Sequence, residues 1–256
     1  MFKVLWRSLK DLFDEMLLLI MVNVIWCVMC LPLLALAIVA VIQGDTFFAT
    51  LIAFLAVLPL GPANGGLYTI AQRVIEGRTS KIADFFAGVK ATAKLGWKIY
   101  GLWMFVLVTL LFNMSFYASL SNTVGAFLLV LFLYLTAIWF AVLIYIGPLM
   151  IVQTDKSIKL IARNAALMTF GRPLFTLVTL ILMTLIVGVS VGFTLVLLPA
   201  LIMFSFLAVW SFRATTKLIE DADERRRLAE EKAATAVGGP RYSSDKGRGG
   251  QIKPRE

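Results

Sequence analysis

The sequence predicts an all-α, polytopic membrane protein: a bundle of six transmembrane helices arranged as three hairpins, with short amphipathic interfacial helices. Of its 256 residues, 60% are hydrophobic and 15% are charged, against about 45–50% and about 25% in soluble domains. Uncharged runs longer than the roughly 20 residues that cross a bilayer recur along the chain. This composition excludes a disordered chain, a coiled coil and a small disulfide scaffold, and it makes a soluble α/β enzyme improbable.

The first four spans are separated by short polar breaks. The uncharged run Met16–Ile42 comes first and is interrupted by Gln43-Gly44-Asp45. It is too long for the 7–15 apolar residues of a cleavable signal, so we expect it to be retained as a span. The second run covers residues 46–71, the third 99–120 and, after Ser121-Asn122, the fourth 123–152.

The remaining apolar run, residues 173–212, carries no charge and would be about 60 Å long as one helix. That length is twice the thickness of a bilayer core. We therefore predict two spans with a turn around Gly188–Gly192.

With six spans, all 24 lysines and arginines fall on one side of the membrane. Because positive residues mark the cytoplasmic side, both termini are predicted to be cytoplasmic. The net charge of +9 follows from this rule, so we expect the lipid bilayer and anionic lipids of the inner leaflet as partners, and no nucleic acid.

Four segments are predicted: an interfacial amphipathic segment at 1–15, the membrane domain at 16–212, a charged cytoplasmic helix at 213–237 and a disordered tail at 238–256. Further short amphipathic segments precede the third and fifth spans, the first of them with Ser80 as candidate N-cap. Proline recurs in the second span of each pair, at Pro59, Pro62, Pro148 and Pro199. Three diverged copies of one hairpin and coincidence both remain open as explanations.

The second span contains a helix break, and this is the candidate ligand site. Transporters bind substrates at interrupted helices because loosened backbone groups can contact a ligand. The alternative, which we prefer, is a packing kink in which Gly61-x-x-x-Gly65, like Gly188-x-x-x-Gly192, contacts another helix. The residues concerned are Pro59, Gly61, Pro62, Asn64, Gly65, Gly66 and Tyr68.

This region resembles the YesL family of bacterial membrane proteins. The resemblance rests on Leu60-Gly61-Pro62-Ala63-Asn64-Gly65-Gly66-Leu67-Tyr68 and on the segment from Asp84-Phe85-Phe86 to Lys90 and Lys94. The sequence departs from the family pattern at Leu60, Gly66, Thr69, Val89 and Ala93, and the resemblance covers about residues 1–215. It implies a plasma-membrane protein associated with carbohydrate uptake. It brings no catalytic residues. Asp84, Phe85, Phe86 and Lys90 lie in the amphipathic segment before the third span and are predicted to be interfacial.

The sequence lacks the residue type most common among general bases and metal ligands. There is no histidine, and no ionisable side chain other than Cys and Tyr lies inside a predicted span, although ion-coupled carriers usually hold one there. Cys27 and Cys30 are expected to be buried and inert. We expect no enzyme, no cofactor and no metal, but an accessory or interaction subunit that binds a transporter or sensor subunit. A carrier or channel for an uncharged small solute is the alternative, and a purely structural organiser cannot be separated from the first by sequence.

Overall fold

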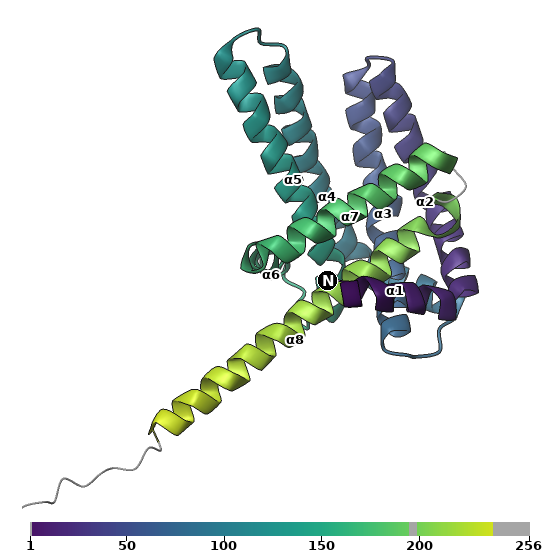
Figure 1. Cartoon of the computed structure of the whole chain (residues 1–256). Helices are drawn as coiled ribbons and strands as arrows, with labels where there is room; N and C mark the ends of the chain where they lie inside the picture. The colour runs from purple at the N-terminus through teal and green to yellow at the C-terminus, as the bar shows by residue number, and fades with distance from the viewer. Residues whose placement is uncertain (1, 195–198, 238–256) are drawn as a thin grey trace, which may run out of the picture. The chain divides into compact units, whose positions relative to one another are not determined.

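The computed structural model describes residues 2–194 and 199–237, and all regular structure in these ranges is helical (Figure 1). Six helices are long and apolar enough to cross a membrane, which confirms the predicted all-α class. The elements are α1 (Phe2–Asp14), α2 (Met16–Ile42), α3 (Thr46–Ile75), α4 (Ile82–Ala118), α5 (Thr123–Val152), α6 (Ile158–Gly171), α7 (Pro173–Thr194), the π-helix η1 (Pro199–Met203) and α8 (Phe204–Val237).

The turns that close the first two hairpins lie where the sequence predicts them. Gly44 adopts φ +78°, a left-handed conformation that glycine accepts without strain, and Asp45 caps α3 by accepting a bond from the Phe48 N–H at 3.1 Å. Asn122 caps α5 in the same way, from the Gly125 N–H at 2.7 Å. Both turns lie at the same end of the hairpins in Figure 1, as a hairpin arrangement requires.

The predicted turn at Gly188–Gly192 is wrong, because α7 passes through both glycines and continues to Thr194. Glycine is tolerated inside membrane helices since no water competes for the backbone hydrogen bonds. Neither glycine has a described atom within 4 Å of the position that a Cβ would occupy. The predicted helix contact at Gly188-x-x-x-Gly192 is therefore not found among the described residues.

The amphipathic segments differ from one another. Before the third span there is no separate helix, since α4 runs unbroken from Ile82 to Ala118. Its N-cap is Lys81 rather than Ser80: the Asp84 carboxylate accepts a bond from the Lys81 N–H at 2.8 Å, which satisfies a donor at the helix start. By contrast, α1 and α6 are separate helices, as predicted.

Helix α1 packs on α8 through a narrower stripe than the sequence suggests. Val4 and Ser8 are buried, while Trp6 is 72% and Phe13 71% exposed, so these two aromatic side chains can contact lipid. Asp11 forms an ion pair with Arg213 of α8, and both side chains are largely buried. Arg213 therefore belongs to the packed domain and not to a separate tail.

The chain divides into a compact unit, Met1–Leu218, and a second unit from Ile219 onward. Helix α8 crosses this division without interruption, so the structure has no break at the predicted boundary of 213. The predicted tail at 238–256 lies outside the described residues. Within the first unit the core lies along α3, where Ala63, Ile70 and Ala71 are fully buried.

Candidate functional site

Helix α3 stays helical through both of its prolines. The predicted break is therefore a loss of backbone hydrogen bonds and not an interruption of the helix. Proline has no N–H, and at position 62 it leaves the Leu58 carbonyl, four residues back, without its helical donor. The Trp97 indole of α4 supplies the missing donor, with Nε1 at 2.8 Å from that oxygen. The carbonyl that a ligand could have used is occupied by a neighbouring helix.

The proline of α5 behaves in the same way. Pro148 leaves the Ile144 carbonyl without its helical donor, and the buried Ser211 hydroxyl of α8 donates to it. In both cases a side chain from another helix completes the backbone hydrogen bonding, which an apolar surrounding requires. The freed carbonyls therefore fix helix pairing.

The glycines of α3 bring α4 into backbone contact. A Cβ on Gly61 would lie 2.7 Å from the Gly96 carbonyl carbon, and one on Gly66 would lie 2.7 Å from the Phe85 carbonyl oxygen. A Cβ on Gly65 would collide with the Thr92 side chain. Gly61 faces Gly96, and Gly65, four residues later in α3, faces Thr92, four residues earlier in α4. The two helices therefore form an antiparallel small-residue interface. The packing interpretation of Gly61 and Gly65 is confirmed.

Asn64 and Tyr68 point away from that interface into a cluster of uncharged polar groups. The Trp26 indole donates to Asn64 Oδ1 at 2.9 Å, and Tyr100 is hydrogen-bonded to the same side chain. Tyr68 is hydrogen-bonded to Ser211. Five helices meet here, because the Ile144 carbonyl bound by Ser211 belongs to α5. We call Trp26, Asn64, Tyr68, Tyr100 and Ser211 the amide–tyrosine cluster.

The Tyr68 ring explains the glycine that precedes Pro148. The ring lies where a Cβ of Gly147 would be, so only glycine leaves room for the Tyr68 ring of α3 against α5. Pro59, Pro62 and the glycines thus build the packing, while Asn64 and Tyr68 supply the polar groups. Sequence reasoning missed Trp26, Tyr100 and Ser211, although the carbonyl freed by Pro148 does signal that α5 needs a donor from elsewhere.

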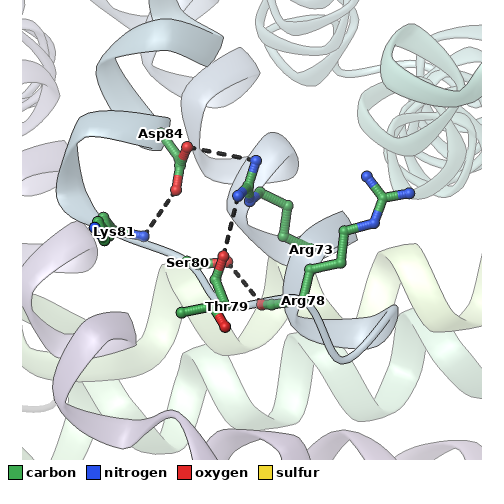
Figure 2. A network of polar contacts seen from close by, with 6 residues as sticks. All are labelled: Arg73, Arg78, Thr79, Ser80, Lys81 and Asp84. Carbon is green, nitrogen blue, oxygen red and sulfur yellow. Dashed lines mark hydrogen bonds and ion pairs between the residues drawn. The ribbon is translucent and has the colours of Figure 1, made fainter.

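The predicted interfacial set separates into different roles (Figure 2). Asp84 caps α4 and pairs with Arg73 of α3 at 3.4 Å, and Arg73 also donates to the Thr79 carbonyl at 3.0 Å. These bonds hold the α3–α4 connection. Phe85 is fully buried, Phe86 is half exposed, and Lys90 is exposed on α4, so only the last two can contact headgroups.

The remaining sequence candidates are structural. Cys27 and Cys30 are buried and unbridged, and Asn23 donates to Cys27 Sγ at 3.6 Å. Within residues 2–194 and 199–237 no group of three His, Cys, Asp or Glu side chains could hold a metal ion. Comparison with protein-family models, curated proteins and solved structures finds no match to this chain. The resemblance to the YesL family therefore stays a prediction.

Proposed function

We propose that this protein is a non-enzymatic accessory or interaction subunit of a bacterial plasma membrane, linked to carbohydrate uptake or sensing. The observation that supports it most is that Trp97 and Ser211 occupy the carbonyls freed by Pro62 and Pro148. A break filled by protein groups provides a rigid scaffold rather than a pathway. Its partners would be transporter or sensor subunits in the same membrane, and the link to carbohydrate rests on the YesL resemblance alone.

A carrier or channel for an uncharged small solute is the second candidate. The amide–tyrosine cluster favours it, because indole, amide and hydroxyl groups without a charge match the hydroxyls of a neutral solute. Each of the five side chains already has a hydrogen-bond partner, in the groups Trp26–Asn64–Tyr100 and Tyr68–Ser211. Transport would require solute to replace those bonds. This requirement makes the carrier the weaker of the two proposals.

One experiment with two arms separates these candidates. We expect the tagged chain, extracted at native expression in mild detergent, to co-purify with a transporter or sensor subunit, and recovery of the chain alone would contradict the accessory role. In reconstituted vesicles we expect no sugar flux. Flux that Asn64→Leu abolishes and Asn113→Leu preserves would establish the carrier instead, since Asn113 bonds only within α4 in the described structure.

The orientation proposal, with both termini cytoplasmic, is tested by cysteine labelling. In a Cys27→Ala, Cys30→Ala background, Gln43→Cys and Ser121→Cys should react with an impermeant maleimide in intact cells. Both positions are exposed in the hairpin turns, and Gln43 avoids the positive φ of Gly44.

Three positions serve as the opposite set. Thr79→Cys, Ser157→Cys and Ser243→Cys should react only after the cells are permeabilised, because the basic loops and tail are placed inside. Reaction of Thr79→Cys or Ser157→Cys in intact cells would reverse the proposed orientation.

A further inference from the structure

Two adjoining pockets lie in the groove between α4, α5 and α6, outside the amide–tyrosine cluster. The first is an open pocket of about 470 Å³ whose lining includes Lys94, Lys98, Lys156 and Ser157. We call it the lysine pocket. It lies at the end of α4 that carries the basic residues, where α5 ends and α6 begins.

The second pocket is apolar, has a volume of about 120 Å³, and is lined by side chains that include Ile99, Trp103, Trp139 and Ile161. We call it the apolar pocket. Ile158 lines both pockets. Along α4 the lysine pocket ends at Lys98 and the apolar pocket begins at Ile99, so the groove passes from charged to apolar within one helical turn.

The charge in the lysine pocket is uncompensated. Among the described residues no carboxylate forms an ion pair with Lys94, Lys98 or Lys156. The nearest acid in sequence, Asp155, accepts a bond from the Ser157 N–H at 2.9 Å and does not line the pocket. Three positive groups around one hollow favour an anion.

Lys156 is held in place by the end of α5. Its ammonium donates to the carbonyls of Met150 at 2.8 Å and Ile151 at 3.0 Å, which leaves one of its three N–H donors free. Partial burial lowers the pKa of Lys156 below its usual value, because an apolar surrounding disfavours the charged form. An anion beside the ammonium would offset that penalty.

Surface lysines on the basic side of a membrane protein need no ligand, since the positive-inside rule explains them. Two observations go beyond that rule here: the lysines share one hollow, and that hollow adjoins an apolar pocket. The apolar pocket also includes Trp103 in its lining, whose buried indole N–H has no acceptor in the described structure. A soluble anion would use only the first pocket.

We propose that this groove binds one anionic phospholipid, with its phosphate among Lys94, Lys98 and Lys156 and the start of one acyl chain in the apolar pocket. Basic pockets between membrane helices recognise lipid phosphates in this manner. The rest of the chain would lie against exposed side chains such as Leu102. The proposal requires no partner subunit, so it can fail or hold independently of the accessory role.

The test measures lipid binding to the full-length protein by native mass spectrometry in detergent. We expect long-chain phosphatidic acid to bind in a single saturable step and phosphatidylcholine of equal chain length to bind much more weakly. Lys94→Gln with Lys98→Gln should weaken phosphatidic acid binding about tenfold or more, because each lysine near an anionic headgroup contributes about 1 kcal/mol. Both lysines are exposed helical residues, so this variant should fold.

The control removes the same charge from outside the groove. Lys159→Gln with Arg163→Gln, both exposed on α6 and lining neither pocket, should change the affinity less than about twofold. Equal weakening by the two double variants would reduce the effect to surface charge and overturn the proposal.

Two further arms separate a lipid from a free phosphate. Inorganic phosphate at equal concentration should not displace the lipid, and displacement would assign the site to a soluble anion. Ala166→Phe, at a half-buried residue that lines the apolar pocket, should weaken lipid binding several-fold without removing charge. If its affinity is unchanged and its melting temperature is normal, the acyl chain does not occupy the apolar pocket, which overturns the proposal.

Discussion

Replacement of Gly61 by alanine should lower the melting temperature of the protein in detergent by about 5–10 °C. The new methyl would lie 2.7 Å from the Gly96 carbonyl carbon and 2.9 Å from the Trp97 amide nitrogen, and these backbone atoms cannot rotate away as a side chain can. The helices would have to separate, which costs about 2–3 kcal/mol in a packed interface. Differential scanning fluorimetry on the purified protein measures the effect.

Gly188→Ala is the matched control for this prediction. It is the same substitution in a membrane helix, at a glycine with no described atom within 4 Å of the new methyl. Alanine is favoured over glycine in a helix interior by up to about 1 kcal/mol, so its melting temperature should stay equal or rise slightly. If Gly61→Ala melts like Gly188→Ala, the close contact between α3 and α4 is not required for stability.

Asn23→Leu should be the second large effect, with a melting temperature lower by about 3–10 °C. Asn23 is fully buried, and its Oδ1 accepts a bond from the Ser205 N–H at 2.9 Å, at the junction of η1 with α8. Leucine has a similar size but no acceptor. The buried N–H would be left unpaired, at a loss of about 1–3 kcal/mol.

Asn113→Leu tests whether any asparagine in a span would give the same result. The Asn113 amide donates to the Thr109 carbonyl of its own helix at 2.8 Å in an exposed position, so its replacement strands no buried group. A change within about 2 °C is expected. An Asn23→Leu protein as stable as this control would mean that Ser205 finds another acceptor.

The spans and the first two turns could be predicted from the sequence, because each depends on residues that are close together along the chain. Charge-free length locates the spans, and the polar breaks at Gly44 and Asn122 locate two turns, because a helix end in a membrane protein needs a cap and contact with water. The 173–212 run does contribute to two helices long and apolar enough to span, but its turn does not lie at Gly188–Gly192, because α7 continues to Thr194. Glycines alone do not end a helix that lies in lipid.

The candidate site was half predictable. The prolines and glycines of α3 announce a close contact and a freed carbonyl, and both are found. The partner residues Trp97, Ser211 and Tyr100 could not be predicted. The sequence around a serine or a tryptophan in a span does not indicate whether its side chain faces lipid or another helix. Only the three-dimensional arrangement identifies the donors for the carbonyls freed by Pro62 and Pro148.

The bonds to α8 also set an order for biosynthesis. Asn23 of α2 bonds to Ser205, Asp11 of α1 pairs with Arg213, and the carbonyl freed by Pro148 accepts a bond from Ser211. All three partners belong to α8, which is synthesised last of these helices. During translation α2 and α5 therefore enter the membrane before α8, which supplies the partners of Asn23 and of the carbonyl freed by Pro148, and such unpaired groups are unfavourable in lipid. A nascent chain stalled before residue 205 exposes these groups to the bilayer, and membrane chaperones or proteases could recognise unfinished copies by them.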